Sequence, residues 1–205
     1  MLSYQTVNPD TLELLKTLMS QPEMQGMRLV GGTSLALQYG HRQSIDLDFF
    51  GKLQVSQDEI LEMISRLGFD IRVLNQTRLI LQLVVNRIKV DVIDYSYNWI
   101  DDPVIENGIT LASPKDIAAL KINAIEGRGS KKDFIDVYLL LQYYSLDEIL
   151  NFYASKYPNH SILMALKSLI YFEDAENQTM PKMFINTSWE AMKKSIAKAV
   201  NDYQK

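Results

Sequence analysis

The chain has 205 residues, a net charge of −4 at pH 7 and 47% hydrophobic residues, a composition typical of a globular protein with a sizeable core. No apolar run is long enough to cross a membrane, and the absence of cysteine excludes disulfides and thiolate metal sites. The only histidines, His41 and His160, lie far apart in the sequence, which argues against a histidine zinc site. Any metal site must then consist of carboxylates, which favours Mg²⁺ or Mn²⁺.

Residues 1–5 show no basic flank followed by an apolar run, so we expect no signal peptide. Together with the lack of cysteine, this favours a cytoplasmic protein without a membrane anchor. The acidic charge balance argues against tight, non-specific binding of nucleic acid, because neutralised phosphates supply most of that affinity. A local basic patch would still be compatible with an RNA acceptor.

The N-terminal half, residues 1–112, is predicted to form a small α/β domain because helical and β-type patterns alternate along it. The predicted elements in chain order are a helix over 9–20, a strand over 27–30, a glycine pair, a helix over 33–39, a strand over 44–50, a capped helix over 56–67, and strands over 69–74, 78–85 and 87–94. Turns at 75–77 and 86–87 join the last three strands into a meander, and 107–108 indicate a further hairpin.

Residues 113–205 have a helical pattern and are predicted to form a C-terminal helical region. Helices are expected over 113–126, 130–144, from a capping box at 145–148, over 159–172 and over 188–203, with a polar loop over 173–187. The predicted fold class is therefore α/β of the α+β kind, a mixed sheet with flanking helices followed by a helical bundle.

A glycine pair between a predicted strand and a predicted helix is the first candidate site. Glycine lets the backbone approach a ligand closely, and the start of a helix presents N–H groups and the positive end of its dipole to a phosphate. The nucleotide-binding candidates here are Gly31, Gly32, Thr33 and Ser34. Taken alone, the glycine pair is explained better by a tight turn.

Acidic residues on two predicted strands form the second candidate site. Asp46 and Asp48 are two residues apart, which points both carboxylates to one face of a strand, where they repel unless a cation lies between them. Asp91 lies mid-strand among valines, and a carboxylate there is costly unless it has a partner. If the two strands are neighbours, the three acids converge as in a two-metal site for phosphoryl or nucleotidyl transfer.

Two alternatives apply to these acids. Asp46 and Asp48 could be solvated residues at a strand edge. Asp94 competes with Asp91, but it sits near the end of its strand, where a capping role is common, and parity points it to the opposite face. Together with the glycine pair, the pattern favours the metal interpretation and Asp91.

The order of these motifs resembles the signature of the nucleotidyltransferase superfamily: Gly-Thr at a helix start, Asp-x-Asp after a spacer of twelve residues between Thr33 and Asp46, and a later strand acid. Residues 121–128 fit Lys-x-x-Ala-x-x-x-Arg, and residues 133–136 fit Asp-x-x-Asp. In this order the four motifs resemble the AbiEii/AbiGii toxin family of nucleotidyltransferases. The resemblance spans about residues 28–144, and the last sixty or so residues carry no such motif.

The resemblance implies a nucleotidyltransferase-type core in which a nucleoside triphosphate lies over the glycine turn and Mg²⁺ or Mn²⁺ is held by Asp46, Asp48 and Asp91. It implies phosphate binding by Arg42, Lys121 and Arg128. It matches Asp133 and Asp136 to the acidic pair of the family, which would orient the two basic residues or help to deprotonate the acceptor.

Structural interpretations compete with these roles. Asp133 lies three residues after Ser130, where an acid reciprocates a helix cap. Asp136 could form a surface pair with Lys132, and Arg128 suits the negative end of a helix dipole. Arg42 could be a solvated loop charge.

The function predicted from the sequence is metal-dependent transfer of a nucleoside monophosphate, by a toxin-like enzyme acting on RNA, for example a transfer RNA, and restrained by an antitoxin protein. The alternatives are transfer to a protein or a small molecule such as an antibiotic, and a catalytically silent binding protein. An RNA acceptor predicts a basic groove beside the acids, with candidates Arg66, Arg72, Arg78, Lys131 and Lys132.

Overall fold

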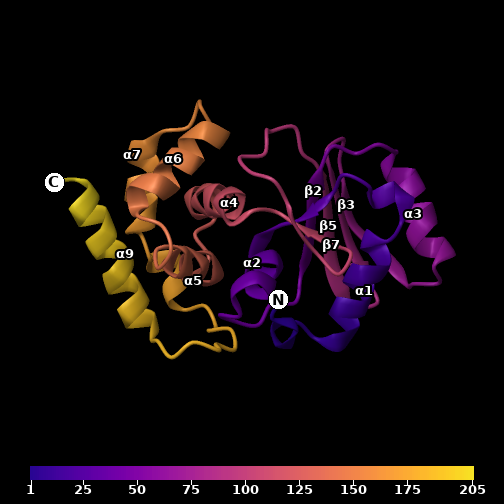
Figure 1. Ribbon diagram of the computed structural model, residues 1–205, viewed down its shortest axis with the longest axis horizontal. Coiled ribbons are helices and arrows are strands. Elements are labelled where there is room, and N and C mark those ends of the chain that lie inside the picture. Colours follow the sequence, from indigo (N-terminus) through magenta and orange to yellow (C-terminus); the bar gives the residue numbers. More distant parts are fainter. The chain divides into compact units, whose positions relative to one another are not determined.

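The computed structural model describes residues 1–205 and divides into two compact units (Figure 1). The first comprises residues 1–96 and 103–112, and the second comprises residues 97–102 and 113–205. The predicted core range of 1–112 differs from the first unit only in residues 97–102. No helix of either unit combines the length and apolar character that crossing a membrane requires.

The first unit is built on a seven-stranded mixed sheet, which confirms the predicted fold class. The strand order is β3-β4-β5-β2-β1-β7-β6, with bounds β1 Arg28–Leu29, β2 Leu47–Gly51, β3 Ile71–Gln76, β4 Ile80–Val85, β5 Ile88–Asp94, β6 Val104–Glu106 and β7 Ile109–Leu111. The predicted meander is β3-β4-β5, and β2 runs parallel to β5 in the middle of the sheet. The predicted hairpin joins β6 to β7 through Asn107 and Gly108, both at positive φ.

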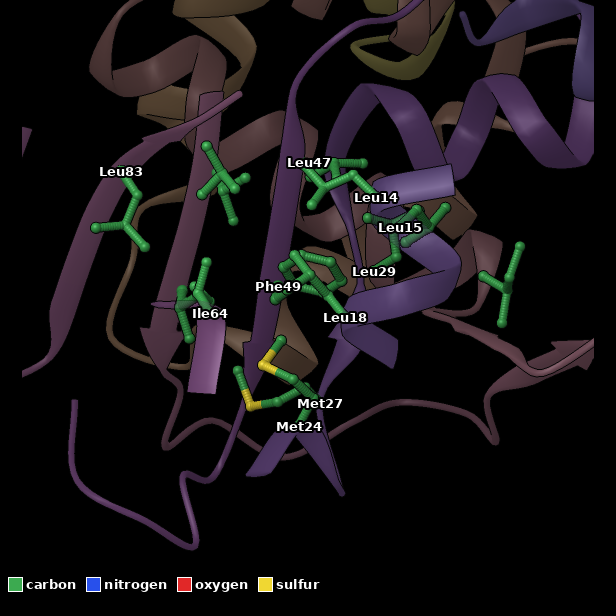
Figure 2. Close-up of a cluster of buried hydrophobic side chains, with 14 of the residues drawn as sticks. Leu14, Leu15, Leu18, Met24, Met27, Leu29, Leu47, Phe49, Ile64 and Leu83 are labelled. Carbon is green, nitrogen blue, oxygen red and sulfur yellow. The ribbon is translucent and has the colours of Figure 1, made fainter. Parts of the chain in front are cut away.

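Three helices accompany the sheet: α1 Pro9–Met19, α2 Gly31–Tyr39 and α3 Gln57–Arg66, with short 3-10 turns at Tyr4–Thr6 and Pro22–Met24. The predicted capping box forms at the start of α3, where Ser56 and Glu59 satisfy each other's backbone N–H groups. Helices α1 and α3 contribute leucine, isoleucine and methionine side chains to the same buried cluster as the central strands. Figure 2 shows leucines of α1 and Ile64 of α3 in this cluster, with Leu47 and Phe49 of β2.

Alternation along β2 and β5 decides which face of the sheet is core. Leu47 and Phe49 of β2 are fully buried and lie opposite Val90 and Val92 of β5. The intervening residues therefore point to the other face of the sheet, away from the cluster. This alternation places Asp48 and Asp91 on the face of the sheet that points away from the buried cluster.

Several predicted boundaries of the first unit are wrong, including the following three. Helix α2 begins at Gly31 rather than at residue 33, because Gly31 takes φ +67° and turns the chain directly from β1 into the helix. Strand β2 begins at Leu47, so Asp46 precedes it; the backbone oxygen of Asp46 accepts a hydrogen bond from the Thr33 hydroxyl. Strand β3 extends through Gln76, which moves the turn to residues 77–79.

The second unit is helical, as predicted. Its helices are α4 Pro114–Gly127, α5 Lys131–Leu140, α6 Leu146–Lys156, α7 Ile162–Leu169, α8 Glu173–Glu176 and α9 Trp189–Tyr203. Helix α8 lies in the predicted loop, and α5 ends before residue 144 because the chain must turn before the capping box that opens α6. Helix α7 is shorter than predicted.

A buried ion pair explains why residues 97–102 belong to the second unit. Asp116 of α4 lies 2.6 Å from the Lys156 ammonium, and both side chains are fully buried. The same carboxylate accepts hydrogen bonds from the backbone N–H groups of Ile100 and Asp101, and Lys156 donates to the carbonyl of Asn98. Two charges on helices thus hold the segment in place.

Candidate active site

The register of β2 against β5 brings two of the predicted metal ligands together. Asp48 lies directly opposite Asp91 in the parallel pair, on the face of the sheet opposite to the one that carries Leu47 and Phe49. Adjacent strands are about 4.8 Å apart, so the two carboxylates are neighbours. Asp46, two residues earlier, shares that side, and its charge acts with those of Asp48 and Asp91 on the Lys89 ammonium. Asp48 and Asp91 therefore lie opposite each other, and the charge of Asp46 reaches Lys89, but the convergence of all three acids on one metal stays a prediction.

Asp91 has two donors on one oxygen. Its Oδ2 accepts hydrogen bonds from Lys89 Nζ at 2.8 Å and from Gln82 Nε2 at 3.1 Å. The residue is only 8% exposed, and its Oδ1 is buried without a hydrogen-bond partner. Burial lowers the pKa of Lys89. The hydrogen bond and charge of Asp91, together with the charges of Asp48 and Asp46, raise that pKa by a larger amount, so the net shift is upward.

The orphaned oxygen of Asp91 is the observation that fits a metal ligand. A buried carboxylate oxygen without a donor is costly, and a hard dication would satisfy it. No group of three or more acidic, histidine or cysteine side chains forms a ready-made metal cage. Mg²⁺, however, is usually bound by one or two carboxylates together with substrate phosphates and water, so an incomplete protein cage suits it.

The glycine turn lies against the acids. A Cβ atom on Gly31 would come within 2.6 Å of Asp48 Oδ2, and Gly31 has φ +67°, so only glycine fits there. A Cβ on Gly32 would come within 2.1 Å of Arg42 Nη2. The start of α2, with its positive dipole end, therefore adjoins the Asp48 carboxylate.

The hydroxyls of the turn are engaged inside the protein. Thr33 and Ser34 are buried; Thr33 bonds the backbone oxygen of Asp46 and the hydroxyl of Ser44, while Ser34 accepts from the Gln38 amide. The Thr33 hydroxyl thus positions the segment that carries Asp46. The Ser34 N–H donates to the carbonyl of Val30 at 3.4 Å, which leaves the backbone N–H groups of residues 31–33 as the predicted phosphate donors.

Arg42 is a buried support for the turn rather than a solvated loop charge. It is 1% exposed, its Nη1 donates to the carbonyl of Gln43 at 3.0 Å, and its Nη2 lies against Gly32. The phosphate contact implied for Arg42 stays a prediction. Asp94, the rejected alternative to Asp91, accepts a hydrogen bond from the backbone N–H of Leu53 at 3.1 Å, which is the capping role expected at the end of a strand.

The second unit gathers the other predicted residues around one buried lysine. Lys121 of α4 places its ammonium 2.9 Å from Asp133 Oδ1 and 2.6 Å from Asp136 Oδ2, both on α5. All three side chains are at most 6% exposed. The interpretation that Asp136 forms a surface pair with Lys132 is therefore wrong, because Asp136 is fully buried and pairs with Lys121.

Asp133 contacts most members of this cluster. It also accepts from Arg128 Nε at 2.9 Å and from the Ser130 hydroxyl at 2.6 Å. Burial alone would raise the pKa of Asp133, but the charges of Lys121 and Arg128 and the hydrogen bonds hold it well below its ordinary value. A carboxylate held in this way is a weak base, which favours the positioning role over deprotonation of an acceptor.

Arg128 and Lys121 differ in accessibility. The Arg128 side chain is 69% exposed and lines a surface pocket of about 380 Å³ with Lys167 and Tyr171, whereas Lys121 is 6% exposed. Their implied phosphate binding stays a prediction.

Sequence reasoning missed Gln82 and Lys89. Lys89 precedes Asp91 by two residues, so parity alone places it on the acidic face. Gln82 could not have been found in the same way, because its place opposite Asp91 depends on the register of β4 against β5.

Comparisons with known proteins agree with this geometry. A protein of Aquifex aeolicus (strain VF5), aq_aa25, is 34% identical over 197 residues, which cover 93% of this chain and 94% of that protein. The solved structure of JHP933 from Helicobacter pylori has a TM-score of 0.56 at 18% identity, over 95% of this chain and 92% of that one. The antibiotic-resistance factor ANT(2'')-Ia has a TM-score of 0.54 at 14% identity, over 71% and 89% of the two chains. Both structures show likeness of fold alone.

The family comparison decides the identity. The model of the nucleotidyl transferase AbiEii toxin family, described as a type IV toxin–antitoxin system, matches residues 13–205. That match includes the glycine turn, the three acids of the first unit and the buried lysine cluster of the second. This chain therefore belongs to the AbiEii family of nucleotidyltransferases.

Proposed function

We propose that this nucleotidyltransferase depends on Mg²⁺ or Mn²⁺ and transfers a nucleoside monophosphate from a nucleoside triphosphate to an RNA acceptor, for example the end of a transfer RNA. A bond forms between the acceptor oxygen and the α-phosphorus, the acceptor hydroxyl loses its proton to solvent water, the bond from that phosphorus to the bridging oxygen breaks, and pyrophosphate leaves. When bound, the divalent ions would lower the pKa of the acceptor hydroxyl and neutralise charge on the leaving pyrophosphate.

The chain's own residues have distinct parts in this proposal. Asp46 and Asp48 would hold the metal ions, and Asp91 would ligate the ion nearer to the acceptor. The N–H groups of residues 31–33 would bind the triphosphate, because only glycine at position 31 lets the backbone lie so near the Asp48 carboxylate. The single observation that carries the proposal is Asp91, which lies opposite Asp48 and has a buried oxygen without a partner.

RNA is the proposed acceptor because the family carries a toxin–antitoxin description and because exposed arginines lie at the β3 edge of the same sheet. Arg72 and Arg78, on and after β3, are exposed and available for a phosphate backbone. Two of the predicted groove residues already have partners within the protein. Lys131 is 6% exposed and donates to two backbone carbonyls, and Arg66 is paired with Glu23 at 2.7 Å. A toxin role restrained by an antitoxin protein in the cytoplasm completes the proposal.

The test is transfer of label from each of the four α-labelled nucleoside triphosphates, with Mg²⁺ or Mn²⁺, to total RNA and to total protein in parallel. We expect label in RNA only, lost with chelator and in Asp46→Asn, a variant that removes one carboxylate charge with little change in volume. Label in protein alone would contradict the RNA acceptor. Activity that survives chelation would contradict the metal requirement.

A further inference from the structure

Three polar side chains form a row across neighbouring strands on the acidic face. Asn75 of β3 lies opposite Gln82 of β4, and Gln82 lies opposite Asp91 of β5. Asn75 Nδ2 donates to Gln82 Oε1 at 3.3 Å, and Gln82 Nε2 donates to Asp91 Oδ2 at 3.1 Å. The row is a chain of hydrogen bonds that ends on the candidate metal ligand.

Chemistry fixes the direction of this chain. The Gln82 amide has one end that donates and one that accepts, and the carboxylate of Asp91 only accepts when ionised. The NH₂ end must therefore face Asp91, which leaves Oε1 for the Asn75 amide. Register forbids an alternative partner on β4, because the neighbours of Gln82 in that strand, Leu81 and Leu83, point into the core.

The distribution of donors on Asp91 is one-sided. Gln82 and Lys89 both bond Oδ2, while Oδ1 is buried and bonded to nothing. A carboxylate fixed in this way cannot turn to offer both oxygens to one ion. It presents a single oxygen in a single direction.

We propose that Gln82 is a positioning residue that holds Asp91 as a one-oxygen metal ligand, by bonding Oδ2 and leaving Oδ1 for the ion. This inference rests on the proposed function, because it concerns the metal ion assigned to Asp91. Hydrogen-bonded supports of metal-ligating carboxylates typically contribute about 10- to 100-fold to metal affinity or activity.

Substitution of Gln82 changes the hold on Asp91 without changing the charge of the site, whereas substitution of Lys89 changes both. Removal of the Lys89 ammonium would loosen Asp91 but would also take a positive charge away from a cation site, and the two effects on metal affinity oppose each other. Gln82 is neutral, so Gln82→Met removes the hydrogen bond at nearly constant volume and charge. Gln82→Asn keeps the amide but shortens its reach by one methylene group.

The experiment measures Mn²⁺ binding by electron paramagnetic resonance, together with steady-state kinetics of the same proteins. We expect both Gln82 variants to bind Mn²⁺ about tenfold more weakly than the wild type, within the range for such supports. We also expect kcat to fall while KM for the nucleoside triphosphate stays unchanged, because Asp91 is assigned to the ion nearer to the acceptor. The matched control is Gln76→Met, the same substitution at an exposed position of β3, for which neither quantity should change.

The outcomes separate the two proposals. If the wild type binds Mn²⁺ and both Gln82 variants bind it equally well with unchanged kcat, the positioning role is wrong and the metal site stands. If the wild type binds no Mn²⁺, or if Asp46→Asn binds as much Mn²⁺ as the wild type, the proposed function fails. The role of Gln82 then fails with it. Circular dichroism melting of each variant shows which proteins are folded, and only folded proteins are compared. If Gln82→Met does not fold, Gln82→Asn is the variant that tests the role.

Discussion

Asp48→Asn is expected to abolish nucleotidyl transfer while the protein stays folded. The substitution removes one negative charge from the face shared with Asp91 and leaves the shape of the side chain almost unchanged. Metal assistance contributes several kcal/mol to such reactions, so we expect kcat to fall at least about a thousandfold. Because one of three like charges is removed, the free energy of unfolding should change by less than about 1 kcal/mol. Label transfer and urea denaturation measure the two quantities.

The matched control for Asp48→Asn is Asp94→Asn. Asp94 accepts the backbone N–H of Leu53 through one carboxylate oxygen, and the side-chain oxygen of asparagine can do the same. Activity of this variant should stay within about threefold of the wild type, which is less than 1 kcal/mol. An Asp48→Asn protein that transfers label at the wild-type rate would show that the acidic face is structural.

Lys121→Met is expected to destabilise the second unit more than any surface substitution. It leaves Asp133 and Asp136, both at most 1% exposed, without the ammonium that lies between them. Removal of one partner from a buried ion pair typically costs about 3–5 kcal/mol, because the remaining charge stays desolvated. Urea denaturation followed by circular dichroism measures the loss.

Lys132→Met is the control for Lys121→Met, since Lys132 lies on α5 and is exposed. Its effect should stay within about 0.5 kcal/mol. Lowering the pH should act on the same cluster. The pKa of Asp133 is lower in the folded protein than its ordinary value of 3.8, so its contribution to stability is present above about pH 4 and is lost as the pH falls further. If Lys121→Met melted like the wild type from pH 7 to pH 3, the cluster would not stabilise the fold.

Much of the fold follows from local patterns. The capping boxes at Ser56 and Ser145 form as predicted, because a Ser and a Glu three residues later need no distant contact. Alternation in β2 and β5 predicted the face of Asp48 and Asp91, since side chains of a strand point to opposite sides in turn. These are the features in which neighbours in sequence decide the outcome.

Features that depend on distant contacts could not be predicted from the sequence. The residue before β2 is bonded by the distant Thr33 hydroxyl, and residues 97–102 are held by the pair of Asp116 with Lys156. Gln82 became a candidate only once the register of β4 against β5 was known. Likewise, the burial of Arg42 and Lys131 contradicts the usual expectation for charged side chains in a loop or on a helix surface.

The most direct test of the central claim is a crystal structure with Mn²⁺ and a non-hydrolysable nucleoside triphosphate, in which anomalous scattering locates the ions. We predict Mn²⁺ between the phosphates and Asp46 and Asp48, with Asp91 ligating one ion through Oδ1 alone and the triphosphate on the backbone of residues 31–33. Ions bound elsewhere, or a triphosphate remote from the glycine turn, would contradict the assignment of the acidic face as the active site.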